Sequence, residues 1–203
     1  MNLHRTSTKP EWSDVRHPNV WQRLAAATGG TVTPGNVLTL AGAVLVAWGL
    51  WRLAGGDYLN ALGLLVLGRA FDLLDGFAAD KTGTKSPLGE ALDAGIDKLA
   101  TFVTLAVFGL AQIAPWWLII AIVLPHTTIA AITLARYGKR EIHPSRTGKL
   151  SMATAWAALA GFVIVRAFPV SGVDILVVAV YGLAGLSIVL GANAAVGYAR
   201  GRT

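Results

Sequence analysis

Four aspartates in the middle of the chain are spaced as two helical pairs. Asp72 and Asp75 are three residues apart, and Asp93 and Asp97 are four residues apart. Residues at these spacings share one face of a helix. Long apolar stretches surround both pairs, and unpaired carboxylates are costly beside such stretches. We therefore expect the four carboxylates to bind a divalent cation, because hard cations take oxygen ligands.

The composition predicts that membrane-spanning helices position these aspartates. The 203 residues are 54% hydrophobic and 14% charged, whereas about 25% of residues are charged in soluble proteins. Six apolar stretches each approach the ~20 residues that cross a bilayer. We predict an all-α integral membrane bundle of six transmembrane helices, at about 36–54, 58–79, 88–112, 115–135, 149–168 and 174–197. The chain has no cysteine, which excludes thiol chemistry and disulfides.

Charge predicts the orientation of this bundle. Most lysines and arginines fall in the termini and in alternate loops, and the opposite loops contain Arg52 and Arg166. The positive-inside rule then places both termini and the aspartates on the cytoplasmic side of a cell membrane. Residues 1–33 form a polar tail without the apolar core of a signal peptide, and residues 34–203 form the transmembrane domain. Residues 20–27 are either an interfacial amphipathic helix or ordinary polar tail.

The short loop between the second and third stretches makes these helices antiparallel neighbours, so both aspartate pairs lie at one depth. Two metal ions bridged by the carboxylates could clamp a diphosphate and stabilise a displacement at phosphorus. Small residues support this interpretation. Gly76 would let a ligand approach the backbone, Gly89 would let the helices pack tightly, and Ala79 keeps the same face small.

These residues form a pattern that resembles the signature of the CDP-alcohol phosphotransferases, an integral membrane family. Seven positions match with the family's spacing: Asp72, Asp75, Gly76, Ala79, Gly89, Asp93 and Asp97. One position differs, because Asp80 stands where the family has an arginine near the nucleotide or diphosphate. The stretch Pro34-Gly-Asn36-Val-Leu-Thr39 is similar to the family's Pro-Asn-x-x-Thr entry with one extra residue.

The resemblance implies a function, a cofactor and a set of site residues. It implies a CDP-linked donor, usually CDP-diacylglycerol, with CMP as the leaving group, two Mg²⁺ or Mn²⁺ ions, and a homodimer. Asp72, Asp75 and Asp93 would bind the metal, and Asp97 would bind it as well or deprotonate the acceptor hydroxyl. The nucleotide would contact Gly76, Ala79, Gly89, Asn36 and Thr39. Membrane lipid is the expected environment, and no nucleic-acid partner is expected.

The basic loop before the fifth stretch bears on the acceptor. Arg136, Arg146 and Lys149 are the cations best placed to hold a phosphate, and the alternative is a basic loop that only contacts anionic lipid. The run Ser145-x-x-Gly148-Lys149 is similar to a stretch of phosphatidylglycerophosphate synthases, which favours glycerol 3-phosphate. Inositol phosphate and phosphatidylglycerol remain alternative acceptors.

Two other functions are compatible with an acidic cluster in a membrane protein. A divalent-cation transporter would also need carboxylates, although such sites tend to lie on broken helices near the bilayer midplane. The second is an inactive relative of the family that serves as a scaffold, which Asp80 suggests.

Overall fold

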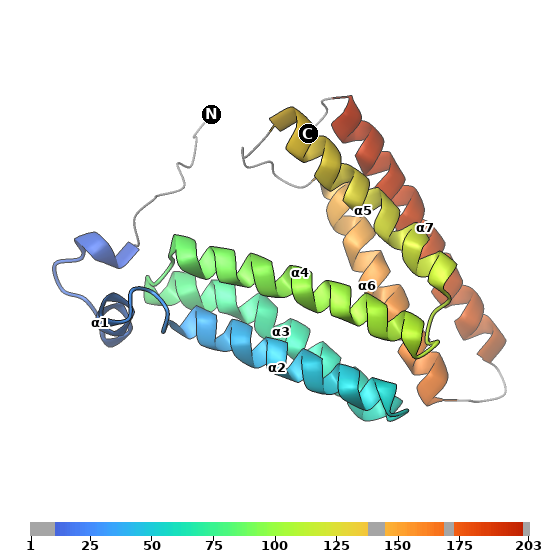
Figure 1. The fold of residues 1–203 in the computed structure, drawn as a ribbon, viewed down its shortest axis with the longest axis horizontal. Helices are drawn as coiled ribbons and strands as arrows, with labels where there is room; N and C mark the ends of the chain where they lie inside the picture. Colours follow the sequence, from blue (N-terminus) through green and yellow to red (C-terminus); the bar gives the residue numbers. More distant parts are fainter. Residues whose placement is uncertain (1–10, 138–144, 169–172, 201–203) are drawn as a thin grey trace. The chain divides into compact units, whose positions relative to one another are not determined.

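The computed structural model describes residues 11–137, 145–168 and 173–200, and within these ranges it contains helices and no strand. The described residues form one short 3-10 helix and seven α-helices, and the α-helices can be followed in Figure 1. Their bounds are η1 Glu11–Asp14, α1 Val20–Ala27, α2 Pro34–Ala54, α3 Tyr58–Thr82, α4 Pro87–Leu110, α5 Trp116–Tyr137, α6 Arg146–Ala167 and α7 Val173–Ala199. The all-α prediction is confirmed, and each of the six apolar stretches is a long helix.

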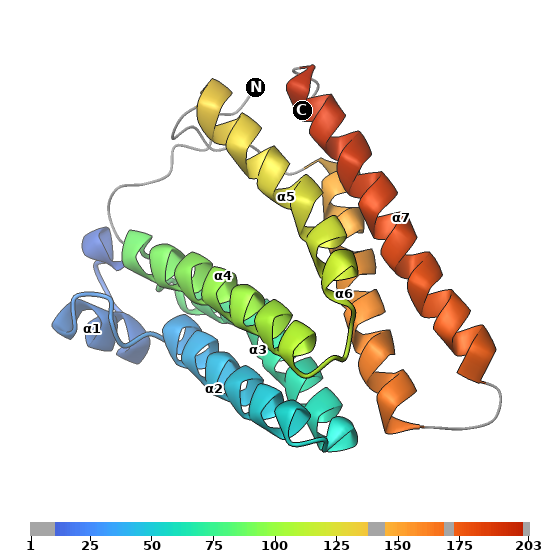
Figure 2. The same cartoon turned by 45° about the vertical axis from the view of Figure 1, so that its right-hand side comes forward.

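The helices form two compact units that divide between Thr104 and Leu105, within the continuous helix α4. The first unit contains η1, α1, α2, α3 and most of α4. The second contains the end of α4 with α5, α6 and α7 (Figure 2). The predicted division into a tail of residues 1–33 and a domain of residues 34–203 stays a prediction.

Helices α2 and α3 pack closely because glycines recur every seven residues on α2, at Gly35, Gly42 and Gly49. A Cβ atom added at Gly42 would lie 3.0 Å from the carbonyl oxygen of Gly68 on α3. At Gly35 it would lie 3.1 Å from the Cβ of Ala79. Small residues allow such close approach of helix backbones. This contact fixes α3, which bears Asp72 and Asp75, against α2.

Residues 20–27, for which the sequence allowed an interfacial helix or ordinary polar tail, form the helix α1, which contacts the end of α3. That α1 lies in a membrane interface stays a prediction. Asn19 and Gln22 form a capping box at its start, in which each side chain accepts from the other's backbone N–H. Asn19 Nδ2 also donates to the Thr82 carbonyl at 3.0 Å, and Gln22 Nε2 donates to the Gly83 carbonyl at 3.4 Å. Gly83 has a left-handed φ of 63°, the conformation that glycine adopts at helix C-termini. Helix α1 thereby holds the start of the α3–α4 loop.

In the second unit, α6 and α7 are joined by two buried serines. Ser151 Oγ donates to the Ser187 carbonyl at 2.8 Å, and Ser187 Oγ donates to the Ser151 carbonyl at 2.9 Å. Both hydroxyls are thus satisfied in an apolar surrounding, where an unpaired one would be costly. Close packing accompanies them, because a Cβ atom at Gly191 of α7 would lie 2.8 Å from Pro125 of α5.

The surface of the helices fits a lipid environment. Among the described helices, three are long and apolar enough to cross a membrane: Pro34–Ala54, Arg146–Ala167 and Ile175–Ala199. Large apolar side chains are also widely exposed, including Leu73 at 79% and Ile175 at 82%. Exposed apolar surface on this scale is typical of contact with lipid or with another protein. That all six long helices cross the membrane stays a prediction.

Candidate metal centre

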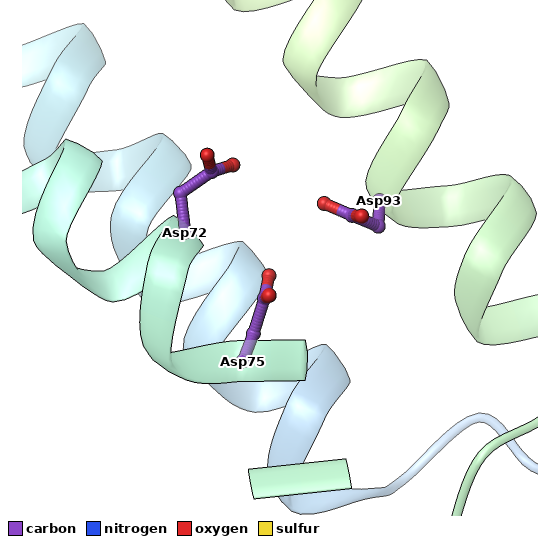
Figure 3. Close-up of side chains that lie close together, drawn as sticks. All are labelled: Asp72, Asp75 and Asp93. Carbon is purple, nitrogen blue, oxygen red and sulfur yellow. The ribbon is translucent and has the colours of Figure 1, made fainter. Parts of the chain in front are cut away.

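Three of the four predicted aspartates converge in the first unit. Asp72 and Asp75 extend from α3 toward Asp93 of α4 (Figure 3). One carboxylate oxygen from each lies within 4.8 Å of the others. Adjacent ligands of an octahedral Mg²⁺ at about 2.1 Å are about 3 Å apart. Side-chain torsions can therefore bring the three oxygens onto one ion, so this donor set fits a hard divalent cation.

Asp75 is the most buried of these carboxylates, with 5% of its surface exposed. Its Oδ2 lies 2.6 Å from Thr39 Oγ1 on α2, and its Oδ1 accepts from the N–H of Gly76 at 2.5 Å. Thr39 Oγ1 also lies 3.1 Å from the Gly35 carbonyl. A hydroxyl has one proton to donate, and a carboxylate can only accept. Thr39 therefore donates its proton to Asp75, which is the nearer of the two acceptors. Thr39 therefore orients Asp75 toward the cluster.

Asp97 lies outside the group of three and is paired with Arg69. Arg69 Nη1 donates to Asp97 Oδ1 at 2.6 Å, and the same nitrogen lies 3.5 Å from Asp72 Oδ2. Arg69 stands three residues before Asp72 on α3, and this spacing places both side chains on one face. The structure thus brings all four predicted aspartates to one region, with an arginine between Asp72 and Asp97.

A pocket adjoins the cluster, and Asp75 and Asp93 are part of its wall. Its other lining residues are Thr33, Gly35, Asn36, Thr39, Gly76, Ala79, Thr84, Lys85, Ser86, Gly89 and Glu90. All five residues predicted to contact the nucleotide are therefore in this lining. The pocket lies where the starts of α2 and α4 meet the end of α3 and the loop that follows it.

Two of the predicted nucleotide contacts also have structural roles in this wall. Asn36 Nδ2 donates to the carbonyls of Gly30 and Thr31, at 3.0 Å each. A Cβ atom added at Gly89 would lie 2.9 Å from Asn36 Oδ1. Gly89 therefore lets the start of α4 approach α2. Gly76, by contrast, is exposed, and nothing lies within 4 Å of a Cβ atom added there.

The position where the family has an arginine is part of an ion pair. Asp80 Oδ1 lies 2.5 Å from Lys85 Nζ, and Lys85 lines the pocket. Lys81, the neighbouring cation, instead lies over the ring of Phe77, with its Nζ 5.6 Å from the ring centroid. The lysine that faces the pocket is thus in the α3–α4 loop.

The predicted acceptor residues lie in the second unit. Arg146 and Lys149 are exposed in the first turn of α6. Ser145 caps this helix, and its Oγ accepts from the N–H of Gly148 at 3.1 Å. The side chain of Arg136 and the loop of residues 138–144 lie outside the described residues.

Sequence reasoning did not select Arg69, Lys85 or the other loop residues of the pocket. A signal for Arg69 was present, because it is three residues before Asp72 in an apolar stretch. Lys85 had no comparable signal, since its approach to the pocket depends on how the α3–α4 loop folds.

The chain matches the model of a known family. The family model for CDP-alcohol phosphatidyltransferase matches residues 32–190, which include the four aspartates and the pocket. No curated protein and no solved structure matches the chain. The predicted family is confirmed, and the closer resemblance to phosphatidylglycerophosphate synthases stays a prediction.

Proposed function

Because the chain belongs to the CDP-alcohol phosphatidyltransferase family, we propose that it transfers a phosphatidyl group from CDP-diacylglycerol to an alcohol and releases CMP. Phosphatidyl transfer to an acceptor is the activity of this family. The observation that carries the proposal is the convergence of Asp72, Asp75 and Asp93 beside a pocket lined by the family's signature residues.

Mg²⁺ or Mn²⁺ is the proposed cofactor, and members of the family use divalent metals. Asp72, Asp75 and Asp93 would hold the ion, with Asp97 as the fourth carboxylate of the site. Metal bound there would supply electrophilic stabilisation of the diphosphate and of the departing CMP. Thr39 supports this role because it holds the Asp75 carboxylate in place by a hydrogen bond.

The pocket beside Asp75 and Asp93 is the proposed site of the cytidine diphosphate. Gly76 leaves its backbone open to a ligand, and Lys85, which is paired with Asp80, is part of the lining near the proposed phosphate position. Asn36 and Gly89 are also part of the lining. The diacylglycerol chains would remain in the bilayer, next to the exposed apolar side chains of α3 and α4.

Asp97 is the proposed general base. The acceptor's hydroxyl oxygen attacks the phosphorus bonded to the diacylglycerol oxygen, and Asp97 takes the hydroxyl proton. The bond from this phosphorus to the bridging oxygen of the diphosphate breaks, and CMP leaves with the electron pair. A phosphodiester lipid results. Arg69 holds Asp97 close to the cluster by a hydrogen bond from its Nη1.

Glycerol 3-phosphate is the proposed acceptor, which would give phosphatidylglycerophosphate. Arg136, Arg146 and Lys149 would bind its phosphate, since arginine offers bidentate hydrogen bonds to phosphate oxygens. The exposed first turn of α6, with its Ser145 cap, supports this assignment. We further propose six membrane crossings, cytoplasmic termini and a homodimer.

The test is CMP release from CDP-diacylglycerol by the purified protein with Mg²⁺ and a panel of acceptors. The panel contains glycerol 3-phosphate, inositol phosphate, serine and phosphatidylglycerol, and the lipid product identifies the acceptor. We expect Asp93→Asn to abolish CMP release and Asp57→Asn, at the far end of α3, to retain it. Metal flux into proteoliposomes without CMP release would instead indicate a transporter. Absence of both with every acceptor would indicate a scaffold.

A further inference from the structure

Arg69 places a permanent positive charge inside the carboxylate cluster. Its Nη1 contacts Asp97 at 2.6 Å and lies 3.5 Å from Asp72. The side chains of Arg69 and Asp97 are about two-thirds buried, with 32% and 34% exposed. The guanidinium carries a positive charge, so Arg69 partly neutralises the two carboxylates that it contacts.

The cluster therefore offers two unequal places for a cation. Asp72, Asp75 and Asp93 face one another, with carboxylate oxygens within 4.8 Å. The other place, between Asp72 and Asp97, is next to the guanidinium of Arg69. A dication there would be repelled by Arg69 and would compete with it for the same two carboxylates.

We infer that Arg69 serves as the second cation of the site until substrate binds. In the substrate-free protein, one divalent ion is held by Asp72, Asp75 and Asp93 while Asp97 stays paired with Arg69. A second ion enters together with the diphosphate of the donor. This inference rests on the proposed function for the identity of that diphosphate.

The chemistry of arginine explains why a diphosphate would release Asp97. Phosphate oxygens accept two parallel hydrogen bonds from a guanidinium, so the incoming diphosphate offers Arg69 a new anionic partner. Asp97 would then be free to contact the second ion or the acceptor hydroxyl. Arg69 is thus a positioning residue, which keeps Asp97 from acting before the donor has bound.

The experiment is a titration of the detergent-purified full chain with Mn²⁺ and no substrate, followed by electron paramagnetic resonance and calorimetry. We expect the wild type to bind one equivalent with the six-line spectrum of an isolated ion. Addition of CDP-diacylglycerol should admit a second equivalent and produce a spin-coupled spectrum. Two equivalents without the lipid, or one equivalent with it, would overturn the inference.

Substitution of Arg69 tests its part directly. In Arg69→Gln we expect the second Mn²⁺ to bind without substrate, at least about tenfold tighter than in the wild type. This factor follows from Coulomb's law for a unit charge removed about 5 Å from a dication, even at the dielectric constant of water. Unchanged second-site affinity in a variant that melts like the wild type would contradict the inference.

Matched variants separate this effect from general changes in charge or folding. Lys98→Gln removes an exposed cation next to Asp97 in the sequence and should still bind one ion. Arg69→Lys retains the charge and should also bind one ion. If Arg69→Gln does not fold, the wild-type titration and Arg69→Lys still decide the question. The number of bound Mn²⁺ ions is measured without reference to CMP release. A result that contradicts this inference is therefore distinguishable from one that contradicts the proposed function.

Discussion

Replacing Thr39 with valine tests how α2 supports the carboxylate cluster. The substitution keeps the shape of the side chain and removes the hydroxyl that donates to Asp75 Oδ2 at 2.6 Å. Asp75 is only 5% exposed, so water does not easily replace this donor. We expect the carboxylate to lose its fixed orientation toward Asp72 and Asp93, and the affinity for metal to fall.

The size of the effect follows from the charge on the acceptor. A hydrogen bond to a charged group contributes about 1.5–3 kcal/mol, and about 1.4 kcal/mol corresponds to a factor of ten in affinity. If this contribution is lost from metal binding, the Kd for Mn²⁺ rises by about 10- to 100-fold. Loss of an outer-shell partner of a metal ligand has effects of the same size.

The assay is calorimetric titration of Thr39→Val with Mn²⁺, together with its melting temperature. Thr39→Ser restores the hydroxyl and should recover most of the affinity. Thr104→Val is the matched control, because buried Thr104 donates to the Ala100 carbonyl of its own helix. A Thr39→Val protein that folds and binds Mn²⁺ as tightly as the wild type would refute the role assigned to Thr39.

Three further predictions concern the helices that position the site. Gly68→Ala should lower the stability by about 1–3 kcal/mol through overpacking, because its Cβ would lie 2.7 Å from Val46 Cγ2 and 2.9 Å from the Gly42 carbonyl. The control Gly63→Ala should leave the stability unchanged, because nothing lies within 4 Å of a Cβ atom added there. Equal melting temperatures of the two variants would contradict this packing. Asn19→Ala should destabilise the chain by about 1 kcal/mol, because the N-cap of α1 is lost. It should also raise the KM for CDP-diacylglycerol, because the α3–α4 loop loses its contact with Asn19. An unchanged KM would count against the link between α1 and the pocket. The hydrogen bond from the Asn60 side chain lowers the pKa of Asp57 below its ordinary value, with Arg52 contributing less. Ionised Asp57 therefore stabilises the fold at pH values above its pKa in the unfolded chain. As the pH falls through the lowered pKa of the folded protein, the melting temperatures of the wild type and of Asp57→Asn should converge. A difference in melting temperature that persists in acid would show that the ionisation of Asp57 does not cause it.

The helical framework was predictable because apolar length and punctuation by Pro, Gly and charge act locally. The stretch predicted at 88–112 is α4, Pro87–Leu110, and it ends near Gln112, which has a left-handed φ of 54°. The face shared by Asp72 and Asp75 also followed from spacing alone. Convergence with Asp93 required only that two consecutive helices be antiparallel.

Contacts between distant residues could not be predicted in this way. Thr39 and Asp75 are 36 residues apart, and their hydrogen bond depends on the register in which the glycines of α2 meet α3. The pairing of Asp97 with Arg69 depends on the rotation of α4, which places Asp93 toward one cation position and Asp97 toward another. The spacing of two residues on a helix predicts that they share a face. It does not predict which residue of another helix each side chain contacts.

The most direct test of the metal centre is anomalous diffraction at the manganese edge from crystals grown with Mn²⁺. The geometry predicts an anomalous peak bonded at about 2.1–2.3 Å to oxygens of Asp72, Asp75 and Asp93. A well-ordered structure with no peak there, or with manganese bound only elsewhere, would contradict the claim that these three carboxylates share an ion.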